Sequence, residues 1–302
     1  MVCALNADMN ANTNTLAALT EEFLASLDVA PSSLKFYRKK LKYFLAWLDR
    51  RGTYRPERKD LVAWRDELMS SGRSPLTSLA YLTIARKFLR WTHEKGLCED
   101  VTEGVELPRV KRDFRDDTLT AEQMQRVLDG IERGDIAGLR DYALLSLMVT
   151  CGLRYSEAAR LKVRDLEPAK EGAVLRFDEK ESVRVPAPIQ AAVMEYLNAR
   201  GPVAPDAPLF AGVGRSRRKP LSARTIGGIV RDAVRKAGCD GLRLTPTSLR
   251  HTTIRLAAQS GERIEDVQRF VRCRDIGTTL RYGGTRPGRR HACGDTIASA
   301  IF

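Results

Sequence analysis

Arg154 stands in a sequence context that suits the binding of a phosphate group. It follows Gly152 at the end of the strongly apolar segment 139–150, and Ser156 is placed to cap a following helix. An arginine on a turn braced by two helices can present its planar guanidinium group to two phosphate oxygens at once. Taken alone, the same pattern also fits an ordinary surface arginine, so other motifs in the chain are needed to distinguish the two interpretations.

Two later segments carry side chains that suit the same chemistry. Residues 246–251 read Pro-Thr-Ser-Leu-Arg-His and supply Arg250, and residues 273–282 read Cys-Arg-Asp-Ile-Gly-Thr-Thr-Leu-Arg-Tyr and end at Tyr282. Arginine side chains oppose the negative charge of a phosphate, and a tyrosine hydroxyl can act as a nucleophile. Many helix tyrosines are simply core residues, however, so the spacing of the motifs has to support the catalytic interpretation.

Together these segments resemble the tyrosine recombinase (phage integrase) family, especially its Xer-like members. That family carries T-G-L-R-x-S-E, a lysine on a β-hairpin, P-H-x-L-R-H and L-G-H-x-x-x-x-T-T-x-x-Y, in this order and at comparable spacing. Here the first pattern ends in Gly-Leu-Arg-Tyr-Ser-Glu (152–157), and the last two match the segments that end at His251 and Tyr282. The match covers about residues 16–282, and four ordered motifs are far more specific than any one.

The resemblance implies a role for each matched residue. Arg154 and Arg250 would clamp the non-bridging oxygens of a scissile phosphate, and Tyr282 would attack phosphorus to give a 3′-phosphotyrosine. Lys180 matches the hairpin lysine that protonates the departing 5′ oxygen, although Asp-Glu-Lys-Glu-Ser replaces the usual Gly-Lys-Gly and a solvated turn lysine is the alternative. Glu157 is interpreted as support for the turn that bears Arg154. Because the tyrosyl bond conserves the phosphodiester energy, no metal, ATP or other cofactor is expected.

The chain departs from the family pattern at two site positions. Thr247 stands where the family usually has a histidine, and Cys273 stands where it usually has histidine or tryptophan. Threonine can donate a hydrogen bond to phosphate but cannot accept a proton near neutral pH, and a thiol is a weak donor. The flanking arginines 272 and 274 are candidates to fill the space in front of Cys273. His251, four residues after Thr247, is interpreted as structural.

These departures leave three functional hypotheses. The first is an active site-specific DNA recombinase of the integrase or transposase type. The second is a catalytically impaired DNA-binding protein that keeps the recombinase fold, although the retention of Arg154, Arg250 and Tyr282 argues against it. The third is a nicking-closing enzyme like a type IB topoisomerase, which uses the same tyrosine and arginine chemistry. Loss of a general base typically slows a reaction by roughly 10²–10⁴-fold without abolishing it, so we favour an active enzyme.

The residues before 108 are expected to form only helices, near 16–27, after Pro31, over 59–69 and over 76–95. Two of these helices carry basic faces that can contact a DNA backbone, although such faces are often only solvated surface. The residues concerned are Lys35, Arg38, Lys39, Lys42, Arg86, Lys87 and Arg90. The resemblance identifies residues 1–107 as a four-helix, SAM-like core-binding domain.

Residues 108–118 are polar and lack any periodicity, which predicts a linker. Residues 119–302 are then expected to form the catalytic domain, mainly α, with a β-hairpin at 173–177 and 183–185. Leu209 and Phe210 are candidates for one more short strand. The tail 291–302 is apolar. It suits either packing on a neighbouring protomer, as the C-terminal segment does in the family, or folding back on its own domain.

Composition fits a protein that binds a polyanion. The chain carries 51 Lys and Arg against 38 Asp and Glu, a net charge of +13, and most of the excess falls after residue 110. Six scattered cysteines without a CxxC pair and three histidines argue against a zinc site or disulfides and for the cytoplasm. No membrane span or secretory signal is expected. The expected partners are double-stranded DNA with a specific site and a homotetramer formed on it, with room for an accessory recombinase or helper protein.

Overall fold

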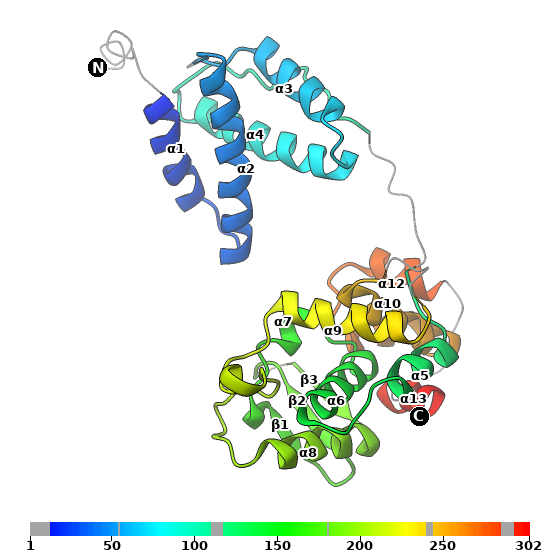
Figure 1. Cartoon of the computed structure of the whole chain (residues 1–302). Helices are drawn as coiled ribbons and strands as arrows, with labels where there is room; N and C mark the ends of the chain where they lie inside the picture. Colours follow the sequence, from blue (N-terminus) through cyan, green and yellow to red (C-terminus); the bar gives the residue numbers. More distant parts are fainter. Residues whose placement is uncertain (1–12, 54, 110–116, 180, 240–243, 285–292) are drawn as a thin grey trace. The chain divides into compact units, whose positions relative to one another are not determined.

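The computed structural model describes residues 13–53, 55–109, 117–179, 181–239, 244–284 and 293–302. The described residues are mainly helical with one small antiparallel sheet, which confirms the predicted fold class (Figure 1). The chain separates into two compact units, Met1–Asp113 and Phe114–Phe302. Most of the predicted linker, from 110 to 116, lies outside the described residues.

The first unit contains four helices in its described part. They are α1 (Thr13–Ala25), α2 (Pro31–Arg50), α3 (Arg58–Ser70) and α4 (Pro75–Glu94). A proline in the first turn favours the start of α2 and of α4, because its missing N–H has no partner at a helix start anyway. Ser74 also caps α4 by accepting a hydrogen bond from the backbone N–H of Thr77.

Aromatic side chains form the core of the first unit. The indole rings of Trp47 and Trp64 lie 5.2 Å apart and join α2 to α3. The rings of Phe23 and Phe88 meet edge to face at 5.5 Å and join α1 to α4. Since these large side chains point inward, most lysines and arginines of α2 and α4 lie on the outer faces. Lys40 is an exception, because it is buried with its Nζ 3.4 Å from the ring centroid of Tyr81.

The second unit is built around one buried helix, α6. In chain order the helices of its described part are α5 (Ala121–Asp129), α6 (Ile136–Thr150), α7 (Tyr155–Ala158), α8 (Ala187–Arg200), α9 (Ala223–Lys236), α10 (Pro246–Gln259), α11 (Ile264–Phe270), α12 (Ile276–Gly283) and α13 (Cys293–Ile301), with 3-10 turns at Val163–Asp165 and Gly214–Ser216. Residues 143–150 of α6 are all buried, and α8 and α10 pack along it. This central helix leads directly into the turn that carries Arg154.

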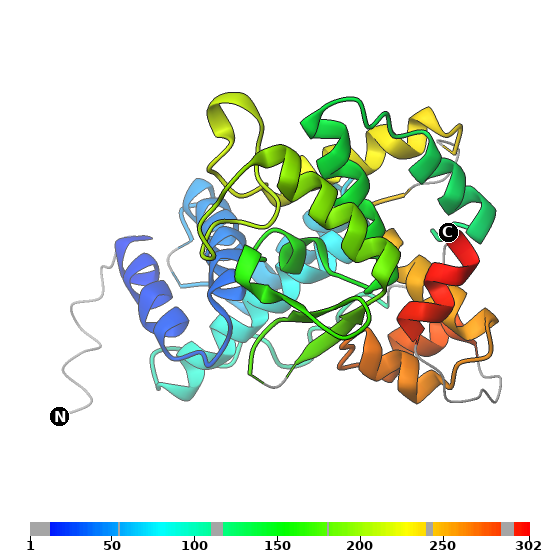
Figure 2. The ribbon, with the colours of Figure 1, turned by 90° about the horizontal axis from the view of Figure 1, so that it is seen from below.

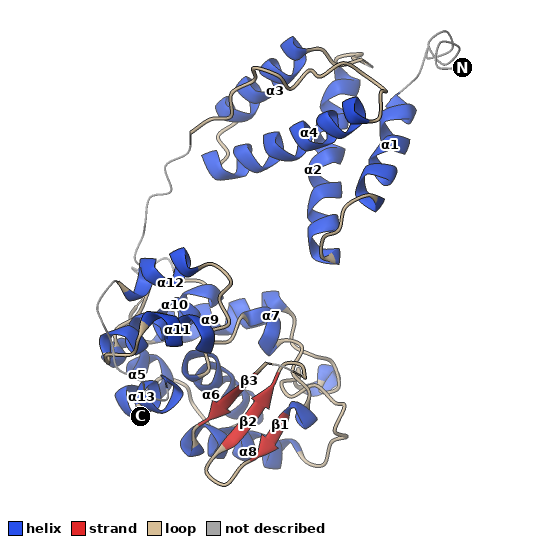
Figure 3. Ribbon diagram, turned by 180° about the vertical axis from the view of Figure 1, so that it is seen from behind, coloured by secondary structure: helices blue, strands red, loops and turns tan. Residues whose placement is uncertain are grey.

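The sheet consists of β1 (Leu166–Pro168), β2 (Ala173–Arg176) and β3 (Ser182–Val185), paired antiparallel in that order. Figure 3 shows the three strands side by side, next to α8. The predicted hairpin is β2 with β3, where Leu175 pairs with Val183. Strand β1 was not predicted, because it is only three residues long.

The prediction of a strand at Leu209 and Phe210 was wrong. Both side chains are buried, but only isolated bridges flank them, from Lys162 to Pro208 and from Ala211 to Pro220. Their apolar character reflects burial in a loop rather than pairing in a sheet.

The C-terminal helix α13 folds back on its own unit. Ile297 and Ile301 are 0% and 2% exposed, and α13 contacts α10, α5, α6 and α11. Figure 2 shows this helix, in red, beside the orange helices of the same unit. Of the two arrangements that the apolar tail suits, the structure has the intramolecular one.

Candidate active site

The first predicted arginine follows a sharp turn at the end of α6. The chain turns at Gly152, whose φ of 58° lies in the left-handed region. A Cβ at this position would lie 2.9 Å from Cγ1 of Val271 and 3.2 Å from Cγ2 of Thr253. Glycine is therefore required here by both the backbone conformation and the close approach of neighbouring side chains.

Arg154 is the residue that immediately precedes α7, and its contacts hold it on the turn. Its backbone N–H donates to Oε2 of Glu157 at 2.8 Å, and its Nη1 donates to Oε1 of the same carboxylate. Its Nη2 donates to the carbonyl oxygen of Arg272. The prediction that Ser156 caps this helix was wrong, because Ser156 lies inside α7, whose cap residue is Arg154, and the carboxylate of Glu157 accepts from the N–H of that cap residue.

Arg250 reaches the same turn from α10. Its Nη1 donates to the carbonyl oxygen of Gly152 at 2.7 Å, and only 6% of the residue is exposed. Burial, together with the positive charges of Arg154 and Arg272, lowers the pKa of Arg250 to about 10. The side chain stays charged at neutral pH, so two cationic groups from distant parts of the sequence meet at one turn.

Glu157 supplies the negative charge between the arginines. Its carboxylate accepts from Arg154 and, through Oε2 at 3.0 Å, from Nη2 of Arg272. Burial alone would raise the pKa of Glu157, but the charge of Arg272 and the hydrogen bonds from Arg154 outweigh it and hold that pKa below its usual range. Glu157 is thus ionised and serves as a support for two guanidinium groups.

Arg272 is a site residue that the sequence indicates only as a candidate, with Arg274, to fill the space in front of Cys273. Its φ is 53°, the only positive value at a non-glycine position among the described residues. Its side chain is 5% exposed and stacks on the ring of Phe177, with 4.1 Å from Cζ to the ring centroid. One signal was present in the sequence, because Arg272 occupies the position of the glycine in the family's L-G-H pattern.

Tyr282 lies near the end of α12 and stacks on a histidine. The rings of Tyr282 and His251 are nearly parallel, at 16°, with their centroids 3.8 Å apart. Nδ1 of His251 lies 3.1 Å from Oδ1 of Asp117, whose other oxygen accepts from the hydroxyl of Ser248 at 2.8 Å. Burial lowers the pKa of His251, although the charge of Asp117 opposes this shift.

The two departures from the family pattern lie in different environments. Thr247 is exposed on the first turn of α10. Cys273 is partly buried, and its thiol donates to the carbonyl oxygen of Asp275 at 3.3 Å. Neither side chain supplies a proton acceptor for a nucleophile near neutral pH.

A pocket joins the hairpin to the arginine turn. Its lining residues are Arg154, Glu181, Ser182, Gln268, Arg269, Arg272, Cys273 and Arg274. Glu181 and Ser182 come from the end of the hairpin, where the N–H of Phe177 donates to the carbonyl oxygen of Glu181 at 2.9 Å. Lys180, the predicted hairpin lysine, lies outside the described residues.

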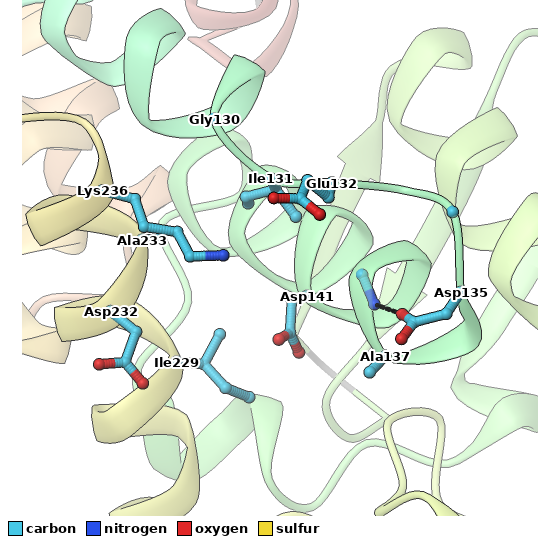
Figure 4. Close-up of a pocket in the computed structure, with 12 residues that line it drawn as sticks. Gly130, Ile131, Glu132, Asp135, Ala137, Asp141, Ile229, Asp232, Ala233 and Lys236 are labelled. Carbon is cyan, nitrogen blue, oxygen red and sulfur yellow. Dashed lines mark hydrogen bonds between the residues drawn. The ribbon is translucent and has the colours of Figure 1, made fainter.

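A second pocket differs in charge and lies between α9 and the loop before α6 (Figure 4). Its acidic lining residues are Glu132, Asp135, Asp141 and Asp232, and Lys236 is its one basic lining residue. Carboxylates repel a phosphate group, so this pocket does not suit DNA. The pocket that contains Arg154 and Arg272 is the one that fits a phosphate.

The predicted DNA-contacting residues of the first unit lie on neighbouring helix faces. Most of them are exposed: Lys35, Arg38, Lys39, Lys42, Lys87 and Arg90. The Nζ of Lys87 on α4 lies 5.6 Å from the ring centroid of Tyr37 on α2, so the two basic faces adjoin. Arg38 is paired with Glu21 at 2.6 Å, and the half-buried Arg86 donates to the carbonyl oxygen of Thr102 at 3.5 Å.

Two features are absent from the residues that the structure describes. No group of three or more His, Cys, Asp or Glu side chains is placed to hold a metal ion there. None of the helices in that part of the chain is both long and apolar enough to cross a membrane.

Comparisons with known proteins agree with the motifs. Residues 117–287 match the phage integrase family. The chain is 28% identical over 296 residues to "Tyrosine recombinase XerD" of Bifidobacterium longum, covering 91% of this chain and 95% of that protein. It is 29% identical over 287 residues to "Tyrosine recombinase XerC" of Stutzerimonas stutzeri, covering 89% of this chain and 90% of the relative.

Solved structures share the fold. The XerH site-specific recombinase bound to its palindromic difH substrate has a TM-score of 0.70 at 17% identity, covering 90% of this chain and 80% of that one. A lambda integrase tetramer bound to a Holliday junction has a TM-score of 0.67 at 16% identity, covering 96% and 83%. Because the family match extends over more than half of the sequence and includes the turn of Arg154, helix α10 and Tyr282, the chain belongs to the phage integrase family.

Proposed function

We propose that this chain is a site-specific DNA recombinase that cuts and rejoins strands through a 3′-phosphotyrosyl intermediate. The observation that carries the proposal is the meeting of Arg154 and Arg250 at the Gly152 turn, with α12 and its Tyr282 packed on the helix that bears Arg250. The membership of the chain in the phage integrase family and the names of its tyrosine recombinase relatives support the same conclusion.

In the proposed reaction, the phenolic oxygen of Tyr282 bonds to phosphorus and the bond from phosphorus to the 5′ oxygen breaks. Arg154 and Arg250 stabilise the charge that builds on the non-bridging oxygens. Lys180 gives a proton to the departing 5′ oxygen, and the proton of Tyr282 leaves to an acceptor other than Thr247 or Cys273. The tyrosyl ester keeps the energy of the phosphodiester. A 5′ hydroxyl from another strand can therefore attack phosphorus, which breaks the bond to Tyr282 and joins the two strands.

The proposed partner is double-stranded DNA with a specific site, contacted by the adjoining basic faces of α2 and α4. The chain's excess of positive charge supports such binding. We also propose a tetramer on DNA, by analogy with the lambda integrase tetramer on its Holliday junction. Five described cysteines are free, which agrees with a reducing compartment such as the cytoplasm.

This function is tested by sequencing the DNA that flanks the gene, searching it for inverted repeats, and building a nicked suicide duplex on such repeats. Wild-type protein should form a covalent protein–DNA adduct on it, and Tyr282→Phe should form none. Specific binding without any adduct would instead identify a DNA-binding protein that has lost catalysis. Relaxation of supercoiled plasmid that lacks the repeats would identify a topoisomerase.

A further inference from the structure

Arg272 sits in a backbone conformation that arginine rarely adopts. Its φ of 53° lies in the left-handed region, where a Cβ is unfavourable and glycine is preferred. Strain of this kind persists only when the surroundings enforce it, and it gathers at functional sites. The contacts of the side chain must therefore compensate for the conformation.

Those contacts tie Arg272 to both predicted phosphate-binding arginines. Its Nη2 donates to the carbonyl oxygen of Gly152 at 3.2 Å, and that oxygen also accepts from Arg250 at 2.7 Å. The same Nη2 lies 3.0 Å from Oε2 of Glu157, whose carboxylate also holds Arg154. The carbonyl oxygen of Arg272 accepts from Arg154 as well. Arg272 thus shares a hydrogen-bond acceptor with Arg250 and another with Arg154.

The cluster holds more positive charge and more buried donors than its own groups satisfy. Three guanidinium groups surround one carboxylate, that of Glu157. Nε of Arg272 and Nη2 of Arg250 are buried and have no hydrogen-bond partner within the described residues. Arg154 and Arg272 both line the pocket next to this cluster. An anion with several acceptor oxygens is the group that such a cluster suits.

We propose that Arg272 is a positioning residue of the phosphate site, which fixes Arg154 and Arg250 as a pair and adds a third positive charge where the family pattern has glycine. Its charge offsets the loss of the donor that the family usually has at Cys273. The proposal rests on the proposed recombinase function, since the phosphate is taken to be the scissile one.

The test compares single-turnover adduct formation by wild type, Arg272→Gly and Arg272→Lys at saturating suicide duplex. Glycine suits the left-handed backbone, so Arg272→Gly removes the side chain without adding strain. We expect Arg272→Gly to slow adduct formation by about 10²-fold or more, as the loss of one preorganised donor typically does. Arg272→Lys should recover part of the rate, because it keeps the charge but loses the fork. Arg235→Ala, which removes an exposed charge from α9, is the control and should match wild type.

A methylphosphonate at the cleavage position separates positioning from a general structural effect. That substrate has a methyl group in place of one non-bridging oxygen and is therefore uncharged, so the defect of Arg272→Gly should shrink by about tenfold or more on it. An equal defect on both substrates would mean that Arg272 only maintains the fold, and a wild-type rate for Arg272→Gly would overturn the proposal while leaving the recombinase function intact.

Inorganic phosphate provides a readout that does not need catalysis. A phosphate bound to the folded protein raises its thermal unfolding temperature. At constant ionic strength, the rise should be smaller for Arg272→Gly than for wild type and Arg235→Ala. If wild type forms no adduct, the proposed recombinase function is wrong, but the phosphate measurement still tests the role of Arg272. Equal rises in unfolding temperature for wild type and Arg272→Gly would overturn that role.

Discussion

The imidazole ring of His251 lies flat on the phenol ring of Tyr282, with centroids 3.8 Å apart and an angle of 16° between the rings. Asp117 accepts from Nδ1 of His251, so that nitrogen carries the proton. The lone pair of the other nitrogen lies in the plane of the imidazole, whereas the stacked phenol lies above its face. This arrangement positions Tyr282 but does not take its proton.

The stack predicts different effects for two substitutions of His251. His251→Phe keeps an aromatic surface under Tyr282 and should retain most of the rate of adduct formation. His251→Ala removes the surface and should slow adduct formation by up to about tenfold, because an aromatic pair contributes roughly 0.5–1.5 kcal/mol. Single-turnover cleavage of the suicide duplex measures both. Equal losses for the two variants would show that the nitrogens matter more than the stack.

Acid should destabilise the fold through His251. Burial lowers the pKa of His251 in the folded state, while in the unfolded chain it titrates near about 6.5. The unfolded chain therefore binds the proton first, and the fold loses stability as pH falls below about 6.5. Unfolding temperatures of wild type and His251→Phe between about pH 8 and 5 measure this effect. The wild-type temperature should fall more steeply, and parallel curves would contradict the assignment.

The Gly152 turn predicts a stability difference between two glycines. Gly152→Ala meets Val271 at 2.9 Å in addition to its positive φ, whereas Gly238 has a φ of 68° and no atom within 4 Å of the place that a Cβ would occupy. Gly238→Ala should lower the free energy of unfolding by about 1–2 kcal/mol, the cost of the left-handed conformation alone. Gly152→Ala should lower it further and also slow adduct formation, because the carbonyl that holds Arg250 shifts. Urea unfolding compares the two, and equal losses would argue against the close approach.

Thr247→His should accelerate cleavage. Thr247 is three residues before Arg250 on α10, so a histidine there lies on the same helix face. A general base typically contributes about 10²–10⁴-fold, and we expect a gain of at least about tenfold. The rate should also acquire a pH dependence near about 6.5, the ordinary pKa of histidine. An unchanged rate and pH profile would mean that another group already accepts the proton.

The basic face of α2 predicts the salt dependence of DNA binding. Lys39→Ala or Lys42→Ala should each reduce the slope of log K against log salt by about 0.9, if each lysine neutralises one phosphate. Lys59→Ala is the matched control, because Lys59 is exposed on α3 and paired with Glu57 at 2.9 Å. Fluorescence anisotropy at several salt concentrations gives the slopes. An effect of Lys59→Ala as large as that of Lys42→Ala would refute the assignment of this face.

The sequence predicted the helices well because their apolar periodicity and their prolines and glycines are local signals. The resemblance to the family also predicted that Arg154 and Arg250 act together, and the structure brings both to the Gly152 turn. The role of Tyr282 beside them stays a prediction. The predictions of a cap at Ser156 and of a strand at Leu209 were wrong. At the cap, the carboxylate of Glu157 competes with the hydroxyl of Ser156, and at Leu209 an apolar residue buried in a loop has the same sequence pattern as one buried in a strand.

Arg272 and His251 could not be assigned from the sequence for a different reason. The pattern shows that an arginine replaces glycine at 272, but the direction of its side chain depends on the positive φ and on Phe177. In the same way, the stack on Tyr282 requires α12 to pack on α10. Both features arise from contacts between elements that no single segment encodes.

Asp117 also bears on where the second unit can be separated from the first. Three consecutive residues attach to α10: Asp117 accepts from Ser248, Thr118 accepts from Arg255 at 2.7 Å, and the N–H of Leu119 donates to Thr252 at 3.0 Å. A fragment that begins at 119, the domain start suggested by composition, would lose the acceptor for His251. Excision just upstream of Asp117 would keep the stack under Tyr282 intact, so the functional border of this unit lies inside what composition alone marks as connecting chain.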